Sequence, residues 1–169
     1  MALIFGSYPC AFLGAVPPQP YQHWEWRWRD LLTANPGVHF AWHSDAPVTP
    51  LSPIINLHNM VNDTQIDRDG VTVCPAPSWM PARKLTVQQA LPMMTLEAAY
   101  ALDRDSEVGS LKVGKYADLV VLSANPLAVQ PQAIKDIQVR MTIVGGKVEY
   151  CAAGQEAVCP GFGSVQHVP

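Results

Sequence analysis

Proline is the feature that most restricts the fold of this chain, because sixteen prolines are spread over its 169 residues. Each proline lacks a backbone N–H and clashes with the preceding helical turn, so long uninterrupted helices are not expected. We therefore predict short helices separated by loops. A chain of this length can bury a core of its own, but it is too short for a complete (β/α)₈ barrel, which takes roughly 200 to 250 residues or more.

The charge and hydropathy of the chain exclude several classes of protein. It has 11 Lys and Arg against 14 Asp and Glu, a net charge of −3. A nucleic-acid-binding role is not expected, because phosphate contacts need clustered basic side chains. No uninterrupted apolar stretch reaches the roughly 18 to 20 residues of a membrane span. Residues 1–16 are apolar but lack the basic start of a secretory signal, so we expect a strand and loop there, no membrane partner and a cytoplasmic location.

The cysteines do not have the spacing of a zinc ribbon or finger, since no C-x-x-C occurs among Cys10, Cys74, Cys151 and Cys159. Cys151 and Cys159 are near enough in sequence to form a disulfide in an oxidising compartment. Unpaired thiols in a reduced cytoplasm are the alternative that we favour, because a signal sequence is absent.

The first half of the chain has the pattern of a helix followed by a strand. Residues 24–33 place apolar side chains on one helical face, although they also alternate with period two. Asn35-Pro36-Gly37 should end that helix, and residues 38–42 have the bulky alternating side chains of a buried strand. Residues 48–84 are proline-rich, so we expect a long surface excursion, with a short helix over 54–61.

The second half changes from helices to strands. A capping-box pattern over residues 86–89 predicts a helix that Pro92 should kink or end, and Thr95 is expected to cap a second one. An apolar strand over 119–122 follows. Two further predicted strands, 139–144 and 147–150, are joined by Gly145-Gly146 as a hairpin. We expect residues 151–169 to form a weakly ordered tail.

Asp45 is the strongest candidate for chemistry, because it directly follows the predicted strand over 38–42. Barrel enzymes of the α/β class carry their catalytic groups at the carboxyl ends of strands. A carboxylate there can bind a metal ion, or take a proton from a metal-bound water and pass it to a leaving group. The alternative is a structural carboxylate that caps Ser44 or a loop amide.

Four segments resemble the C-terminal portion of amidohydrolase family 3, the branch of the metal-dependent amidohydrolases that includes N-substituted formamide deformylase-like proteins. They are FAWHSDAPVTPLSP, LTVQQALPMMTLEAAYAL, GSLKVGKYADLVVLSANPL and VRMTIVGGKVEY, and the likeness runs from about Trp24 to Tyr150. The resemblance implies an α/β fold: the C-terminal part of a (β/α)₈ TIM barrel plus part of a small composite β-sandwich. The expected divisions are 1–108 for the barrel piece with its last strand and helix, 109–150 for the sandwich segment and 151–169 for the tail.

The resemblance also assigns roles to individual residues. Asp45 occupies the place of the family's S-D-A-P aspartate, a metal ligand and the proton shuttle for the hydrolytic water. His43 stands where the family usually has glycine, so it is either a substrate contact or a side chain that crowds the ion. His58 belongs to a region that covers the pocket in the family, although a solvent-facing histidine is the alternative that we favour. His39 is expected to be packed or hydrogen-bonded rather than a ligand.

The ligand set of the family is incomplete in this chain. Its H-x-H pair, its bridging acidic residue or modified lysine and its later histidines have no counterpart, and a hydrolytic zinc site takes three protein ligands. We therefore expect a C-terminal fragment of a metal-dependent hydrolase of non-peptide C–N bonds such as amides. We expect the isolated chain to be inactive. A divalent metal, zinc, would belong to the complete protein, and the chain alone need not bind one.

The expected partners are a small amide-type substrate and the missing N-terminal barrel portion. A first alternative is a non-catalytic remnant or assembly module that docks to a separately encoded barrel portion. Exposed strand edges would then favour association, including a homo-oligomer. A second alternative is a free-standing β-rich binding domain in which Asp45 is structural.

Overall fold

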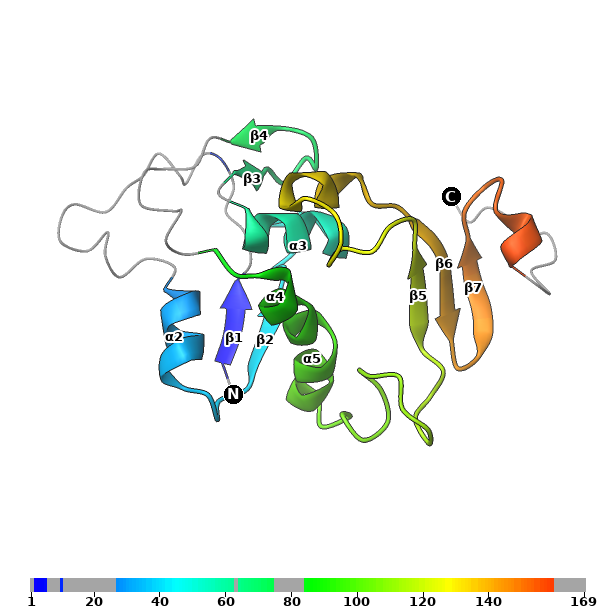
Figure 1. Cartoon of the computed structure of the whole chain (residues 1–169), viewed down its shortest axis with the longest axis horizontal. Coiled ribbons are helices and arrows are strands. Elements are labelled where there is room, and N and C mark those ends of the chain that lie inside the picture. Colours follow the sequence, from blue (N-terminus) through cyan, green and yellow to red (C-terminus); the bar gives the residue numbers. More distant parts are fainter. Residues whose placement is uncertain (1, 6–9, 11–26, 63, 75–83, 160–169) are drawn as a thin grey trace.

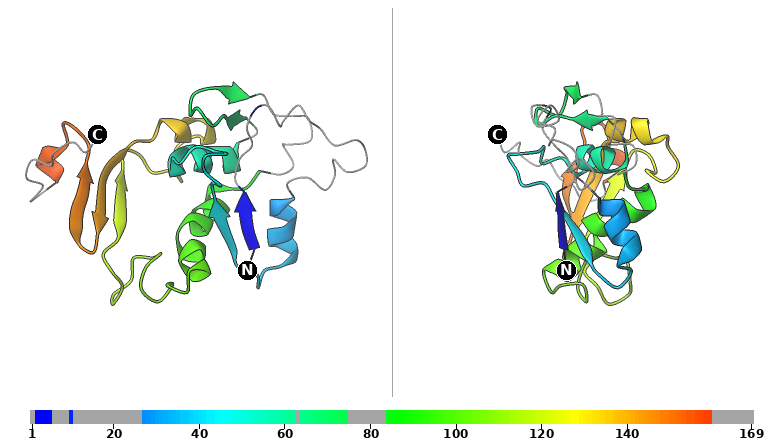
Figure 2. Two further views of the ribbon diagram at one scale, coloured as in Figure 1. Left: turned by 180° about the vertical axis from the view of Figure 1, so that it is seen from behind. Right: turned by 90° about the vertical axis from the view of Figure 1, so that its left-hand side faces the viewer.

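The computed structural model describes residues 2–5, 10, 27–62, 64–74 and 84–159, which form a mixed α/β fold. The described strands make three small sheets. These are the parallel pair β1 (Ala2–Phe5) and β2 (Phe40–His43), the antiparallel pair β3 (Gln65–Ile66) and β4 (Val73–Cys74), and the antiparallel sheet of β5 (Leu119–Leu122), β6 (Val139–Val144) and β7 (Lys147–Cys151). Helices α4 (Val87–Met94) and α5 (Leu96–Ala101) lie between the β1–β2 pair and the β5–β7 sheet, whereas α2 (Trp28–Ala34) lies on the other side of β1 (Figures 1 and 2).

The parallel pair forms where the sequence predicted a buried strand. Strand β2 begins at Phe40, two residues later than expected, and β1 pairs with it in register from Ala2 opposite Phe40 to Phe5 opposite His43. Phe40 and Trp42 pack against the core beneath the helices. Because side chains alternate along a strand, Ala41 and His43 are directed to the opposite face.

The predicted helix over residues 24–33 is confirmed in its second half as α2 (Trp28–Ala34). Trp24 lies outside the described residues. The helix ends at Asn35, whose backbone N–H donates to the carbonyl of Leu31 at 3.0 Å. The Asn35-Pro36-Gly37 stop signal is therefore confirmed, because proline and glycine cannot continue the turn.

Helix α4 (Val87–Met94) confirms the capping-box prediction, because the Thr86 hydroxyl accepts from the Gln89 N–H while the Gln89 side chain accepts from the Thr86 N–H. Pro92 lies inside α4, which ends two residues later at Met94. Helix α5 (Leu96–Ala101) follows at once. The prediction that Thr95 caps α5 with its side chain is wrong. Its backbone is not in the extended conformation of an N-cap, and its hydroxyl instead donates to the Leu91 carbonyl at 2.9 Å.

The prediction of a surface excursion over residues 48–84 is wrong for its central part. Helix α3 (Pro53–Val61) forms close to the predicted span, and its residues 56–61 are all buried. Its buried polar side chains are hydrogen-bonded, as buried polar groups generally are, which offsets the loss of their hydration.

The apolar core combines α3 and α4 with β2 and a 3₁₀ helix, η3 (Pro131–Asp136). Its buried members are Phe40, Leu57, Met60, Val61, Leu85, Val87, Ala90, Met93, Ile134 and Ile137.

The C-terminal hairpin is confirmed, with β6 and β7 joined by Gly145 and Gly146. Both glycines have positive φ, 57° and 81°, the backbone that a tight two-residue hairpin turn requires. The expected weakly ordered tail is wrong for residues 151–159, since β7 extends to Cys151 and is followed by η4 (Glu156–Val158). Residues 160–169 lie outside the described part of the chain.

The cysteines form two disulfides, Cys10–Cys74 and Cys151–Cys159, so the expectation of unpaired thiols is wrong for this structure. The second pair closes because η4 folds the chain back toward the end of β7. The first pair joins residues far apart in sequence, and their contact depends on the tertiary fold.

Within the described residues, no helix combines the length and apolar character needed to cross a membrane.

Candidate functional site

The carboxyl ends of β1 and β2 lie at one edge of the parallel pair, because Phe5 is opposite His43 in the register. Asp45 follows β2 by two residues and therefore lies just beyond this edge. This is the end of a parallel sheet at which α/β enzymes place their catalytic side chains. The structure thus gives Asp45 the strand-end position that its place in the sequence predicted.

A tight turn holds Asp45. Its φ is 52°, in the left-handed region that Asp and Asn adopt more readily than other non-glycine residues. Its carbonyl accepts from the Val48 N–H at 2.9 Å, and the buried Thr49 hydroxyl donates to the Ser44 carbonyl at 2.5 Å. These bonds fix the backbone on both sides of the residue while the Asp45 side chain is left exposed. The turn therefore presents the carboxylate outward from a rigid base.

His43 is the last residue of β2 and is partly buried. It is directed to the face of β2 opposite the one that carries Phe40 and Trp42 into the core, since side chains alternate along a strand. The chain thus brings His43 to the strand end from which Asp45 projects. Its predicted role beside a metal site stays a prediction.

His58 lies on α3 and is only 3% exposed, so the expectation of a solvent-facing histidine is wrong. Its Nδ1 is 3.1 Å from the Asn62 side-chain nitrogen. The same amide nitrogen donates to the His58 carbonyl at 3.0 Å. Asn62 also donates to the Pro131 carbonyl at 2.9 Å, which ties α3 to η3. Burial, aided by nearby Lys135, lowers the pKa of His58.

His39 is part of a link between β2 and α5. Its Nδ1 is 2.7 Å from a Glu97 carboxylate oxygen, and its ring stacks on Tyr100 with 3.7 Å between centroids. The prediction of a packed, hydrogen-bonded residue is confirmed. His39 thus positions α5 against the strand that leads to Asp45.

The described residues around Asp45 do not form a complete metal site. A catalytic zinc takes three protein ligands and keeps an open position. Among the described residues, one group of three His, Cys, Asp or Glu side chains converges closely enough to hold an ion, and it consists of Cys10, Asp67 and Cys74. Asp45 is not a member of that group. The described residues therefore do not fit a metal centre built on Asp45.

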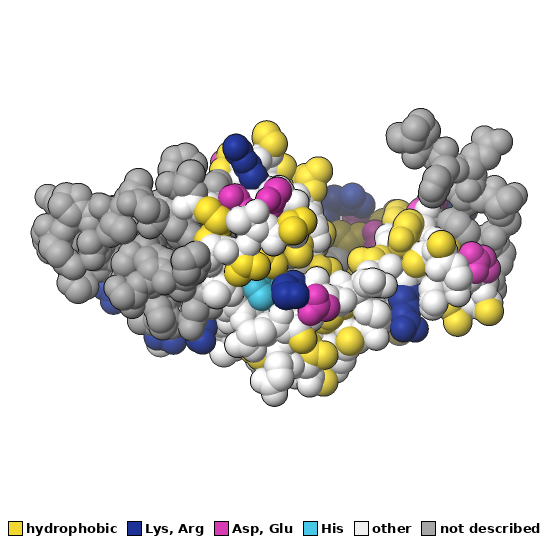
Figure 3. Space-filling view, turned by 90° about the horizontal axis from the view of Figure 1, so that it is seen from above, with side chains coloured by type: hydrophobic (Ala, Val, Ile, Leu, Met, Phe, Trp, Pro, Cys, Tyr) yellow, Lys and Arg dark blue, Asp and Glu magenta, His cyan; other side chains and the backbone are white. Residues whose placement is uncertain are grey.

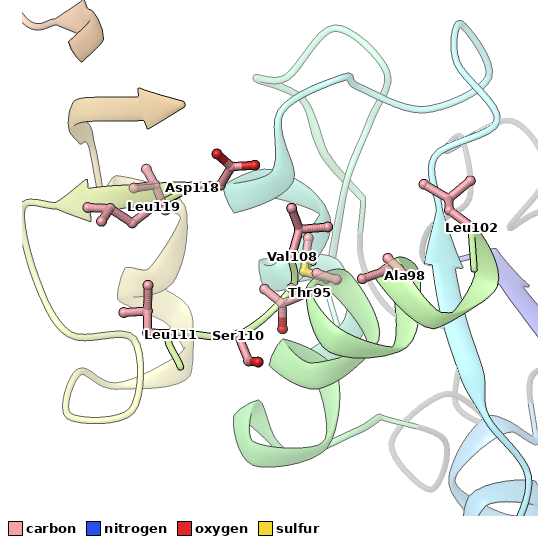
Figure 4. Close-up of a pocket in the computed structure, with 12 residues that line it drawn as sticks. Thr95, Ala98, Leu102, Val108, Ser110, Leu111, Asp118 and Leu119 are labelled. Atoms are coloured by element: carbon pink, nitrogen blue, oxygen red, sulfur yellow. The ribbon is translucent and has the colours of Figure 1, made fainter. Parts of the chain in front are cut away.

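A cavity lined by described residues lies elsewhere, between α4, α5 and strand β5. It has a volume of about 450 Å³, and apolar side chains such as Ala98, Leu102 and Leu119 line it (Figure 4). The Ser110 hydroxyl at its border is buried without a hydrogen-bond partner among the described residues. A smaller cavity of about 240 Å³ lies beside β4 and the turn after β3. None of Asp45, His43 and His58 is among the described residues that line either cavity.

Three asparagines, two in α3 and one at its C-cap, are structural residues whose burial we did not predict. Asn56, Asn59 and Asn62 recur every three residues along the helix and are all buried. Asn56 donates to the Pro50 and Ser52 carbonyls at 2.6 and 2.9 Å. Asn59 bonds both backbone groups of Ile66, and Asn62 bonds Pro131. The spacing itself was the available signal, since polar residues repeated at i, i+3 within an apolar helix imply buried partners.

Comparison with known proteins identifies the family. The model of the amidohydrolase family matches residues 17–150. The chain belongs to the amidohydrolase family. YtcJ of Bacillus subtilis (strain 168), which carries the name amidohydrolase, is 26% identical over 73% of this chain and 22% of its own length. The N-substituted formamide deformylase of Arthrobacter pascens is 32% identical over 75% of this chain and 21% of its own length.

A crystal structure of an amidohydrolase from Thermotoga maritima MSB8 also resembles this amidohydrolase chain, with a TM-score of 0.48 and 22% identity. The likeness covers 70% of this chain and 24% of that one. The chain thus spans about a fifth of the length of the curated relatives it matches. Amidohydrolases of this family are generally metal-dependent.

Proposed function

We propose that this chain supplies the C-terminal portion of a metal-dependent amidohydrolase that cleaves non-peptide C–N bonds, such as those of amides. The placement of Asp45 is the observation that carries the proposal, since this residue, which resembles the family's S-D-A-P aspartate, lies just beyond the carboxyl end of a parallel strand pair. The name of the Arthrobacter relative points to N-substituted formamides as a substrate class to test.

The finer architecture is part of the same proposal. Residues 1–108 would form the last strand and helix of a (β/α)₈ barrel, and residues 109–150 would form part of a composite β-sandwich. The β1–β2 pair supports this, because parallel sheets normally have both faces covered and more strands than two. Within the described residues, β1 and β2 pair only with each other. The remaining strands would come from a barrel portion on the N-terminal side.

Asp45 would act in that complete protein as one metal ligand, zinc being the ion that we favour. Its carboxylate would also carry a proton to the leaving nitrogen, the work of a general acid–base group. His43 would lie beside the substrate at the same strand end. The isolated chain should be inactive, because the described residues do not converge on Asp45 as a three-ligand set. A cytoplasmic location completes the proposal.

A chimera tests this assignment. The matching residues of the Arthrobacter deformylase would be replaced by those of this chain, and hydrolysis of an N-substituted formamide would be measured. We expect Asp45→Asn to lower kcat by about 100-fold or more, the scale of a lost general acid–base group. The control is Asp103→Asn, another exposed aspartate with positive φ. Equal activity of the two variants would contradict the role of Asp45. Turnover by the isolated chain, with stoichiometric zinc, would contradict the fragment assignment.

One alternative function, a docking module, is supported by an observation of its own. The outer edges of β1 and β2, which pair with no other strand among the described residues, also suit a non-catalytic module that docks to a separately encoded barrel portion or to a second copy. Size-exclusion chromatography of the chain, alone and with such a partner, distinguishes this module from the enzyme portion when combined with the activity assay. A complex without hydrolysis would favour the module.

A further inference from the structure

Three side chains with metal-binding atoms meet beyond the carboxyl end of β1. Cys10 lies five residues after that strand, Asp67 directly follows β3, and Cys74 ends β4. The two Sγ atoms and a carboxylate oxygen of Asp67 all lie within 4.8 Å of one another. Figures 1 and 2 show the β3–β4 hairpin beyond the end of β1, where the two segments approach. The cluster is separate from Asp45, which is not part of it.

The strand register explains why two of these side chains share a face. Gln65 pairs with Cys74 and Ile66 with Val73 in the antiparallel hairpin. Because side chains alternate, Asp67 lies on the same side as Gln65 and reaches Cys74 as a diagonal neighbour across the two strands. The sequence separation of the residues gave no hint of this contact, since it depends on the hairpin.

The hairpin is held firmly enough to act as a preformed site. Its turn is closed by Asp69, whose carboxylate accepts from the N–H groups of Val71 and Thr72 at 2.9 and 2.8 Å. Its first strand is fixed to α3 through Asn59, which bonds both backbone groups of Ile66. Asp67 and Cys74 therefore have a fixed backbone, which lowers the entropy lost when a ligand binds.

The chemistry of the three groups suits a thiophilic divalent cation. One oxygen of Asp67 accepts from the Arg68 N–H at 2.7 Å, and its other oxygen has no hydrogen bond within the described residues. Cys74 is buried and Cys10 is partly buried. Two thiolates and a carboxylate are a typical donor set for zinc with one position left for water. Tetrahedral Zn–S and Zn–O bonds of about 2.0 to 2.3 Å place ligand atoms roughly 3.5 to 4 Å apart.

We propose that Cys10, Cys74 and Asp67 form a zinc site when the Cys10–Cys74 disulfide is reduced. A dithiol reductant supplies two electrons and two protons: the Sγ–Sγ bond breaks, two thiols form, and the reductant becomes a disulfide. Zn²⁺ then replaces the two thiol protons, which pass to solvent, and the Asp67 carboxylate completes three protein ligands. A small-molecule disulfide reverses the step: it takes up the two electrons and becomes two thiols with protons from solvent, while the Sγ–Sγ bond re-forms and the ion is released. The bound ion would join the end of β1 to the hairpin, as the disulfide does in the oxidised chain.

The test uses the unmodified 169-residue chain in both redox states. Zn²⁺ would be titrated into reduced and oxidised protein against a chromophoric chelator, and iodoacetamide labelling of each cysteine would be followed by peptide mass spectrometry. We expect one equivalent of zinc in the reduced chain and none in the oxidised chain. Zinc should slow the labelling of Cys10 and Cys74 at least tenfold and leave Cys151 and Cys159 unchanged. Equal labelling with and without zinc, or equal protection of all four cysteines, would overturn the proposal.

Variants identify the third ligand. Asp67→Asn should weaken zinc binding by about tenfold or more, comparable to losses at other metal sites, while Asp103→Asn should not change it. Cys10→Ser should abolish binding. Cys74→Ser can fail to fold because the side chain is buried, so the labelling of the unmodified chain remains decisive. An Asp67→Asn affinity equal to that of the unmodified chain would exclude the carboxylate as a ligand.

Discussion

Replacing Asn59 by alanine tests whether the buried asparagines of α3 hold the hairpin in place. The Asn59 side chain is 3% exposed. Its amide donates to the Ile66 carbonyl at 2.9 Å, and its oxygen accepts from the Ile66 N–H at 2.8 Å. Ile66 is itself 3% exposed, so Asn59→Ala leaves one donor and one acceptor buried without partners. Each such group costs about 1–3 kcal/mol. We therefore expect a loss of about 2–4 kcal/mol in the free energy of unfolding, allowing for partial hydration of the space.

Urea unfolding of the oxidised chain, followed by tryptophan fluorescence, measures this loss. With a denaturant slope of about 2 kcal/mol per M, the midpoint should fall by roughly 1–2 M. Asn35→Ala is the matched control, because Asn35 also donates from its side chain, to the Leu31 carbonyl at 2.8 Å, but is exposed. It should cost less than about 0.5 kcal/mol. If both variants unfold at the same urea concentration, the reasoning from buried partners is refuted.

Further outcomes are expected from single substitutions at four positions. Asp45→Asn should change the free energy of unfolding by less than about 0.5 kcal/mol. Asp45→Val should lower it by about 1–2 kcal/mol, because a β-branched residue does not readily adopt the positive φ of 52°. Thermal melts of the two variants compare these effects. Burial lowers the pKa of His58 below its ordinary value of 6.5, so the unfolded chain binds the proton more readily. Stability should then fall as pH drops below about 6.5, and His58→Gln should remove that part of the slope in unfolding titrations. Gly109→Ala should cost about 2–4 kcal/mol, because φ is 84° and the new Cβ would lie 2.6 Å from the Ala99 Cβ. Gly114→Ala, with φ of 93° and open space around it, should cost about 1–2 kcal/mol in the same melts.

The elements that could be predicted from the sequence are those whose cause is local. The capping box at Thr86 and Gln89 and the glycine turn of the hairpin depend on bonds between residues at most a few positions apart. Helix α3 was expected as a short surface helix. Its burial was missed because it depends on where its asparagines find partners, such as Pro131 on η3. A proline-rich, polar segment resembles a surface loop until those distant partners are known.

In the candidate sites, too, the features with local causes could be predicted and those that depend on tertiary packing could not. The strand-end position of Asp45 followed from one strand and the residues after it, and the structure has it there. The meeting of Cys10, Asp67 and Cys74 could not be predicted, because it needs β1, the hairpin and their packing together. Val71 and Val73 in the hairpin region are hydrophobic but exposed. The hydrophobic residues there therefore do not mark the buried face as in a half-buried strand, and the sequence pattern indicated these strands only weakly. The face that includes the hairpin carries hydrophobic atoms at its surface (Figure 3).

The two candidate metal-binding positions can be separated because, among the described residues, three ligands converge at one of them and not at the other. Cys10, Asp67 and Cys74 offer three converging donors, whereas Asp45 is outside that group. Zinc bound by the reduced, isolated chain should therefore be lost on Cys10→Ser and retained on Asp45→Asn, as measured by metal content after gel filtration. The reverse pattern would place the ion at Asp45 and would mean that residues outside the described part of the chain complete that site. A zinc ion holds its protein ligands at bond distances of about 2.0–2.3 Å. If both variants lost the single bound ion, Asp45 and Cys10 would therefore have to bind the same ion, which would contradict two separate sites.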